Sequence, residues 1–300
     1  MSYLKGIRCP RCGYEGKPEE AFDGCPRCRE EGISVNFSTQ YDFSGQESIL
    51  REEFHEARGP GLWSHRAFLP IGPNTEPVSM GEGNTPLLHC RRLGERLGLP
   101  ELYLKNETLN PTWSYKDRLC SVGVTRAVEV GAPAVVVSST GNHGSAVAAY
   151  AAAAGLPCVI FTKAGVPNTM KTLMQSYGAY VFATEQSLDR WKIMRWCVKE
   201  LGWYPLSGYV DPAIGSNCYG VDGYKTIAFE LFEQMGNNLP DFIITPSAYS
   251  DGMYGIWKGI LDLNSIGLID KKPVMIAAEA WGSLKTTLAQ GAPAPVAVSA

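Results

Sequence analysis

From about residue 100 onward, short apolar runs alternate with longer segments of helical periodicity. AVVVSST (134–140) is a β-branched run typical of a buried strand, and the Ala-rich SAVAAYAAAAG (145–155) after it predicts a helix. The same reading predicts strands at 102–107, 157–164, 180–185, 241–247 and 274–280, and helices at 114–131, 168–178, 187–202, 223–236 and 252–267. This alternation predicts an α/β fold in which helices cover both faces of parallel sheet.

The first hundred residues lack this alternation. Residues 1–35 are rich in Cys, Pro and Gly, and they are too few to hold a core without a staple. Residues 36–90 contain GPGLW, LPIGPN and GEGNTPLL, which are dense in turn-forming residues and predict an irregular arm. A chain of 300 residues is nevertheless long enough to bury a substantial core.

Charge and hydropathy exclude several classes of partner. The formal net charge is -3 and the pI is near 5.9, which gives no reason to expect binding to nucleic acid or to an anionic membrane. No apolar run reaches the ~20 residues that a membrane span requires. The N-terminus MSYLKGIRCPRCG also lacks the apolar stretch of a signal peptide. We therefore expect a cytoplasmic protein.

Four cysteines near the N-terminus form two CPRC motifs, Cys9-x2-Cys12 and Cys25-x2-Cys28. Two thiolates spaced by two residues can bind one metal ion, and two such pairs complete a tetrahedral four-sulfur site. Zinc is the usual metal there, with iron the second choice because both suit this geometry. Two disulfides are the alternative, which a reducing cytosol disfavours. A site closed by four thiolates is structural rather than catalytic.

Lys116 lies in the segment Asn110–Arg118, where Pro, Thr and Ser predict a turn that ends at a helix start. In the first helical turn, the helix dipole disfavours the charged form of its amine. A neutral amine is the form that makes an imine with a carbonyl compound. The alternative is an ordinary solvated lysine, because lysine is seldom buried.

Two other segments join a predicted strand to a predicted helix. Ser138–Gly144 (SSTGNHG) offers hydroxyl, amide and backbone N–H groups where α/β sheets bind ligands, although Gly-Asn-His-Gly is also compatible with a plain turn. In Pro246–Met253 (PSAYSDGM), successive backbone N–H groups could surround a phosphate. Asp251 would be a poor neighbour for a phosphate, so a simple helix cap is the alternative.

Four motifs together resemble a known family. They are NPTWSYKDR (110–118), SSTGNHGSAVAAYAAAAG (138–155), GEGNTPLL (81–88) and GYKTIAFEL (223–231). They resemble threonine synthase and its relatives among the fold-type II pyridoxal-phosphate enzymes, the group that includes tryptophan synthase β-like proteins. The resemblance runs from about residue 75 to 290 in the family's order, and such threonine synthases often carry an N-terminal cysteine-rich segment.

The resemblance implies roles for individual residues. Lys116 would carry pyridoxal 5'-phosphate as an aldimine (Schiff base) and later move protons, while Asn142 would hydrogen-bond the cofactor's phenolic oxygen. The residues standing where the family has its phosphate-binding loop are Ala248, Tyr249, Ser250, Asp251 and Gly252. The residues expected to contact the substrate are Ser114, Ser139, Thr140 and His143. The resemblance implies a small amino acid, or a phosphate ester of one, as the substrate.

The sequence departs from the threonine synthase pattern in four places. Trp113 replaces a Gly and would set a bulky ring beside the lysine, and the phosphate loop reads AYSDG with a single Gly. His143 stands where threonine synthases usually have Thr or Ala, and Gly-Asn-His is the form of the serine/threonine ammonia-lyases. The Asn-Pro-x-Arg stretch that holds the substrate's phosphate aligns with Asp211–Ile214, which has no arginine, so Lys163 or Lys171 would have to substitute.

Three functions remain open from these observations. The first is a lyase resembling threonine synthase, which converts O-phosphohomoserine to threonine and phosphate. The second is a serine/threonine-type ammonia-lyase or a β-replacement enzyme, and the third is an inactive relative that binds a partner. Family members continue with a strand and a Ser or Thr at the pyridine nitrogen, whereas this sequence stops at APAPVAVSA, so the chain is either trimmed or a shortened relative.

The expected organisation is a two-domain fold-type II enzyme behind a small zinc-ribbon-like knuckle, acting as a homodimer. The expected domains are a four-cysteine zinc knuckle at 1–35, a large cofactor-binding domain at 36–124 and 211–300, and a small domain at 125–210.

Overall fold

The computed structural model describes residues 3–56, 61–296 and 298. Its largest sheet has four parallel strands in the order β8-β7-β6-β9. These strands are β6 (Val135–Ser138), β7 (Cys158–Lys163), β8 (Tyr180–Thr184) and β9 (Tyr204–Pro205). The two central strands are buried on both faces, which explains why β6 and β7 read as continuous apolar runs rather than as an alternating pattern.

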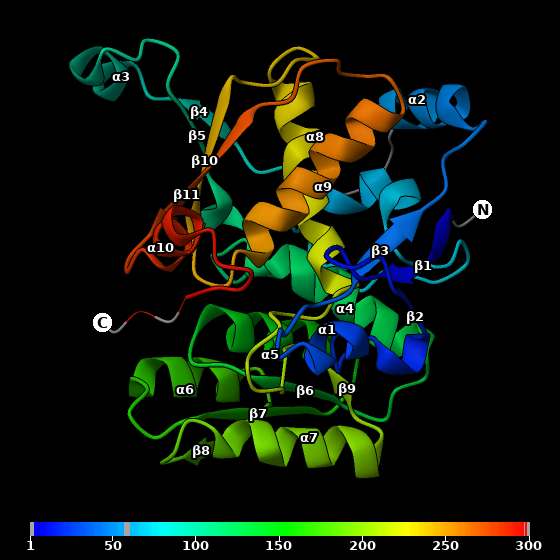
Figure 1. The fold of residues 1–300 in the computed structure, drawn as a ribbon, viewed down its shortest axis with the longest axis vertical. Coiled ribbons are helices and arrows are strands. Elements are labelled where there is room, and N and C mark those ends of the chain that lie inside the picture. Colours follow the sequence, from blue (N-terminus) through cyan, green and yellow to red (C-terminus); the bar gives the residue numbers. More distant parts are fainter. Residues whose placement is uncertain (1–2, 57–60, 297, 299–300) are drawn as a thin grey trace.

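Helices cover both faces of this sheet. Figure 1 shows α5 (Asn142–Ala153) and α6 (Asn168–Ser176) on one face and α7 (Asp189–Leu201) on the other. The Ala-rich sequence of α5 is buried almost along its whole length, because small side chains let the helix lie close to the strands. The predicted α/β fold with helices on both faces of parallel sheet is therefore confirmed.

A second group of helices packs beside α5. It contains α4 (Lys116–Glu129), a 3₁₀ helix (Gly220–Tyr224), α8 (Lys225–Gln234) and α9 (Asp251–Ser265), and Figure 1 shows α4 between this group and the four-stranded sheet. Glycines allow the close approach: a Cβ on Gly223 would lie 2.1 Å from the Arg118 carbonyl oxygen, and one on Gly259 would lie 2.5 Å from that of Lys225. Glycine at these two positions therefore fixes how closely the helices can pack.

Two parallel strands, β10 (Phe242–Ser247) and β11 (Val274–Glu279), lie beside α9, and α10 (Ser283–Gln290) follows them. Their apolar side chains remain exposed, with Ile244 64% and Phe242 61% accessible. Parallel sheet is ordinarily covered on both faces, so this pair of strands presents a surface of the kind that associates with other polypeptide.

The N-terminal region is more regular than the sequence suggests. It begins with β1 (Leu4–Arg8), β2 (Glu15–Gly16), a 3₁₀ turn (Pro18–Glu20), α1 (Pro26–Glu30) and β3 (Ser38–Tyr41). The segment expected to be an irregular arm contains α2 (Glu47–His55) and a 3₁₀ helix (Gly61–Phe68). Leu50 and Phe54 of α2 are buried four residues apart, a periodicity that the surrounding turn residues obscure.

A small antiparallel pair completes the fold. It consists of β4 (Leu87–His89) and β5 (Tyr103–Lys105), joined through α3 (Arg91–Leu97), with a 3₁₀ turn (Glu107–Leu109) before α4. In Figure 1 this pair extends away from the helical group, with α3 at its tip. Throughout the described ranges, the helices are too short or too polar to cross a membrane. The domain boundaries, the homodimer and the cytoplasmic location stay predictions.

Candidate active site

A cavity of about 250 Å³ lies where the start of α4, the loop after β6 and the loop after β10 meet. Because the sequence places a helix N-terminus at each of these points, backbone N–H groups without intrahelical partners face the same region. The residues lining the cavity are Tyr115, Lys116, Ser138, Ser139, Thr140, His143, Arg190, Ser216, Pro246, Ala248, Tyr249, Ser250, Asp251 and Gly252.

Lys116 is the first residue of α4, and its side chain reaches the cavity. The turn before it is fixed by Asp117, whose carboxylate accepts hydrogen bonds from the backbone N–H of Thr112 at 2.8 Å and from the Thr112 hydroxyl at 2.6 Å. Burial raises the pKa of Asp117 to about 6, although the two hydrogen bonds from Thr112 act to lower that pKa. The Lys116 Nζ donates to the Tyr224 hydroxyl at 3.0 Å, which sets the direction of the amine.

The loop after β6 brings three predicted residues to the cavity. The Ser139 hydroxyl accepts from the backbone N–H of Gly144 at 2.9 Å, so it helps to begin α5 as well as lining the cavity. Thr140 is exposed at the rim. The His143 Nε2 is buried without a hydrogen-bond partner in the described part of the chain. Burial and the nearby Lys116 lower the pKa of His143 to about 3, so its imidazole is neutral at neutral pH.

Two predicted site residues are not among those lining the cavity. Asn142 is exposed as the first residue of α5, although Thr140 and His143 line the cavity. Ser114 is buried, and its hydroxyl accepts from the backbone N–H of Lys116 at 3.3 Å. The geometry thus gives Ser114 a place in the turn that positions the lysine, rather than in the wall of the cavity.

All five predicted residues of the phosphate loop, 248–252, line the cavity just before and at the start of α9. Ser250 has a φ of 63°, and this left-handed conformation lets the chain enter the helix. The Asp251 carboxylate accepts from the Ser216 hydroxyl at 2.9 Å and from the Ser216 backbone N–H at 3.3 Å. Asp251 therefore ties the helix start to Ser216, and the first amides of α9 remain available to a ligand.

Trp113 adopts a φ of 62°, the left-handed region that favours glycine. Its side chain is 63% exposed and is not among the groups lining the cavity, so the expected placement of a bulky ring beside the lysine is not what the structure shows. The resemblance aligns this position with a Gly, and the positive φ gives the physical reason for that residue. The strain of the left-handed backbone at Trp113 is therefore not offset by burial of its side chain.

We expect Trp113→Gly to raise the free energy of unfolding by about 1 kcal/mol, because it removes the cost of a left-handed side-chain-bearing residue while little packing is lost. Chemical denaturation of both proteins measures the change. Leu109→Gly is the matched control: Leu109 is 64% exposed in the same segment but has an ordinary φ, so it should lower the free energy of unfolding by about 0.5–1 kcal/mol. Equal destabilisation by both substitutions would contradict the strain argument.

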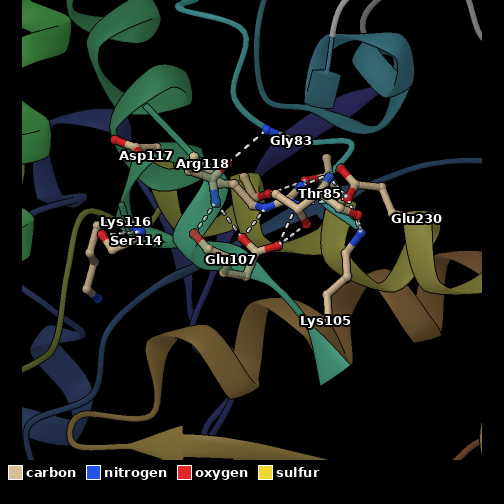
Figure 2. Close-up of polar contacts among 12 residues, drawn as sticks. Gly83, Thr85, Lys105, Glu107, Ser114, Lys116, Asp117, Arg118 and Glu230 are labelled. Carbon is tan, nitrogen blue, oxygen red and sulfur yellow. Dashed lines mark hydrogen bonds and ion pairs between the residues drawn. The ribbon is translucent and has the colours of Figure 1, made fainter. Parts of the chain in front are cut away.

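Arg118, two residues after Lys116, is the centre of a buried ion cluster. Its guanidinium donates to the Glu107 carboxylate at 2.7 and 2.8 Å and to the Glu230 carboxylate at 2.6 and 2.8 Å. Figure 2 shows Arg118 between these acids, with Thr85 and Lys105 beside them, while Lys116 extends to the other side. Burial alone would raise the pKa of Glu230, but Arg118 and Lys105 outweigh it and hold that pKa at about 2. The cluster anchors α4 to α8 and to the segment before β4.

The four cysteine sulfurs near the N-terminus converge within 4.8 Å of one another. The Sγ atoms of Cys9 and Cys28 are 3.6 Å apart, and those of Cys12 and Cys25 are 3.5 Å apart. These separations exceed the ~2.05 Å of a disulfide bond. They approach the edge of a tetrahedron with metal–sulfur bonds of ~2.3 Å, so the donor set fits a single metal ion.

The cysteine knuckle and the segment that follows it pack against the wall of the cavity. The Asn36 side-chain amide donates to the Ser216 carbonyl oxygen at 2.7 Å, and Ser216 is the residue that Asp251 holds from the other side. Cys218, two residues on, is buried in the same apolar cluster as three of the four knuckle cysteines. The knuckle is therefore in structural contact with the site, rather than hanging free at the N-terminus.

Several residues in or beside the site were not singled out from the sequence. Ser138 belongs to the predicted loop, but its buried hydroxyl without a partner distinguishes it from its neighbours only in three dimensions. Arg190 lies in an ordinary amphipathic helix, and Ser216 lies in an irregular loop. The Tyr224 hydroxyl meets Lys116 across 108 residues of sequence, although GYKTIAFEL was among the motifs recognised.

Comparison with known proteins identifies the family. The model for "Pyridoxal-phosphate dependent enzyme" matches residues 78–299. The chain is 33% identical over 294 residues to a threonine synthase of Methanosarcina acetivorans, covering 96% of this chain and 68% of that protein. It is 35% identical over 277 residues to a threonine synthase of Methanocaldococcus jannaschii, covering 92% and 65%. The chain thus spans about two thirds of the length of these curated relatives.

A solved structure of a related enzyme has a similar fold. The threonine deaminase of T.th. superimposes with a TM-score of 0.58 and 25% identity, covering 72% of this chain and 66% of that one. The family inferred from the four sequence motifs is confirmed by these comparisons. The chain belongs to the pyridoxal-phosphate dependent enzymes and, within them, to the relatives of threonine synthase.

Proposed function

We propose that this protein is a pyridoxal-phosphate-dependent lyase with the activity of a threonine synthase, in which Lys116 holds the cofactor covalently. In this reaction O-phosphohomoserine and water give threonine and inorganic phosphate. The observation that carries the proposal is the cavity itself, where Lys116 meets the 138–143 loop and the 248–252 loop. The similarity to two archaeal threonine synthases supports the choice of substrate.

The cavity fits the cofactor. Its lining offers an amine at Lys116, the helix-start amides of α9 for a phosphate, and two buried polar atoms that lack partners among the described residues, Ser138 Oγ and His143 Nε2. Such orphaned atoms are costly unless a ligand satisfies them. When bound, pyridoxal phosphate supplies an electron sink for the carbanion formed at the substrate's Cα.

The side chains around Lys116 suit proton movement. The Tyr224 hydroxyl stays protonated because burial raises its pKa well above the usual value, so it can donate to the amine when Lys116 is neutral. A neutral Lys116 would take the proton from Cα, which requires a positioned base of this kind. His143, neutral at neutral pH, can hydrogen-bond the substrate but carries no charge to offset a phosphate.

A second candidate is an ammonia-lyase acting on serine or threonine. It is favoured by His143, which lines the cavity, and by the similarity to a threonine deaminase. In this reaction the leaving group is a hydroxyl, so the site would need no cation for a phosphate ester.

Parallel assays separate the two functions. The purified protein, supplied with pyridoxal phosphate, should show visible absorbance and release phosphate and threonine in equal amounts from O-phosphohomoserine. Release of a keto acid from serine or threonine instead would replace the first function by the second. A colourless protein that turns over neither substrate would contradict both and favour the inactive relative.

We also propose that the four cysteines bind one zinc ion, because their sulfurs converge within 4.8 Å and leave no coordination position for a substrate. Metal analysis should find about one zinc per chain. Cys28→Ser should lose the metal and lower the thermal midpoint by about 2–4 °C for each kcal/mol of stability lost. Cys90→Ser, outside the cluster, should leave the metal content unchanged. Iron in place of zinc would correct the identity of the metal, and no metal at all would refute the site.

A further inference from the structure

The cavity is lined by a cationic side chain that lies outside the four family motifs. Arg190, the second residue of α7, is among the residues that line it. Its Nε donates to the Ser187 carbonyl oxygen at 3.0 Å, and its guanidinium lies over the Trp191 ring at 5.4 Å from the ring centroid. Its other nitrogens make no hydrogen bond to the described residues. Among the described residues, no carboxylate forms an ion pair with Arg190. The neighbouring Asp189 pairs with Lys192.

The lysines considered from the sequence do not take this place. The Lys171 Nζ donates to the Ala164 carbonyl oxygen at 2.9 Å, and neither Lys171 nor Lys163 is among the residues lining the cavity. Ile214, where the resemblance would put an arginine, packs instead against the knuckle: a Cβ on Gly24 would lie 3.1 Å from its Cγ2. Ile214 is not among the residues lining the cavity.

The charges lining the cavity favour an anion. Besides Lys116, which the proposed cofactor would occupy, Arg190 is the one Lys or Arg side chain among the described residues of the lining, while Asp251 is its single acid and is engaged by Ser216. Burial lowers the pKa of Arg190, with Tyr249 opposing the shift, yet a guanidinium stays protonated at any physiological pH. An arginine with free η nitrogens in a partly desolvated cavity is suited to bidentate binding of a phosphoryl group.

We propose that Arg190 binds a phosphoryl group in this cavity, in place of the arginine that is absent from 211–214. This inference deepens the proposed function, because the phosphoryl group belongs either to the substrate ester or to the cofactor. Both sources present the same chemistry to the guanidinium, and the experiment distinguishes them.

The first test needs neither cofactor nor turnover. Phenylglyoxal modifies arginine side chains, and peptide mass spectrometry measures the rate at Arg190. Inorganic phosphate at ten times its dissociation constant should slow modification of Arg190 about tenfold relative to chloride at equal ionic strength. Arg195 is the internal control, because it lies exposed on the same helix outside the cavity. Equal rates at Arg190 with and without phosphate would refute the proposal, whatever the activity assays show.

The second test identifies the source. Arg190→Gln should weaken one phosphoryl ligand by about tenfold or more, the effect of losing a charge-assisted hydrogen bond, whereas Arg195→Gln should not. If the substrate is the source, the KM for O-phosphohomoserine rises while the affinity for pyridoxal phosphate is unchanged. If the cofactor is the source, binding of pyridoxal phosphate weakens while that of pyridoxal, which lacks the phosphate, does not. Unchanged affinity for both phosphoryl ligands in Arg190→Gln would overturn the assignment.

Discussion

Replacing Lys116 by alanine is expected to abolish the visible absorbance of the loaded protein and to lower turnover by roughly 10³-fold or more. The structure places this amine at the cavity with the Tyr224 hydroxyl at 3.0 Å and with no acid in ion-pair contact among the described residues. Under the proposed function, the substitution removes both the covalent attachment point and the positioned base. The fold should survive, because Lys116 is only partly buried and contributes no ion pair to the core.

Borohydride reduction followed by peptide mapping gives the decisive measurement. In the wild-type protein the cofactor should be found on the peptide that contains Lys116, and in Lys116→Ala it should be absent from every lysine. Lys171→Ala is the matched control, since that lysine lies outside the cavity and should leave absorbance and turnover unchanged. Cofactor fixed to a different lysine in the wild-type protein would contradict the assignment of Lys116.

Replacing Arg118 by methionine is expected to lower the free energy of unfolding by about 3–5 kcal/mol. Arg118 is fully buried, and its removal leaves the carboxylates of Glu107 and Glu230 without their shared partner. Uncompensated buried charge, rather than lost packing, accounts for the size of the effect. Denaturant titration of the two proteins at neutral pH measures it.

A surface pair provides the control for Arg118. Lys271 pairs with Asp241 at 2.5 Å, but both side chains are more than 70% exposed, so Lys271→Met should change stability by less than about 1 kcal/mol. A loss of similar size in the two variants would show that the buried cluster is not a major source of stability.

The buried cluster also predicts a pH dependence. The pKa of Glu230 is depressed from its ordinary 4.5 to about 2 by Arg118 and Lys105. Its contribution to stability is therefore complete above pH 4.5 and is lost as the pH falls from 4.5 toward 2. Arg118→Met should show a shallower loss over that window.

Much of the fold follows from sequence periodicity. The strands and helices expected after residue 100 all occur, because buried parallel strands and the helices between them have distinct apolar patterns. The helix α2 was missed, since its two buried residues lie among turn-forming neighbours and its packing depends on α8 and on the 3₁₀ helix Gly61–Phe68 that follows it. Short paired strands such as β4 and β9 were missed because two or three residues carry too little pattern.

The predicted site residues that line the cavity belong to motifs that mark the start of a helix. Lys116, Ser139, His143 and the 248–252 loop reach the cavity because each stands at a strand-to-helix or turn-to-helix junction. Arg190 could not be predicted, since nothing in an amphipathic helix indicates which arginine turns toward a cavity built elsewhere. The roles given to Asn142 and Ser114 came from the resemblance, and neither residue is part of the lining.

The contact between Asn36 and Ser216, made across 180 residues, also orders events during biosynthesis. A ribosome releases the N-terminal part first, so the four cysteines are available to the proposed metal ion before residue 216 is synthesised. Tyr224 and Glu230, which contact α4 through Lys116 and Arg118, are synthesised about a hundred residues after that helix. The loop at 248–252 is synthesised later still. The four cysteines are therefore synthesised before Ser216, Tyr224 and the 248–252 loop, which complete the surroundings of Lys116.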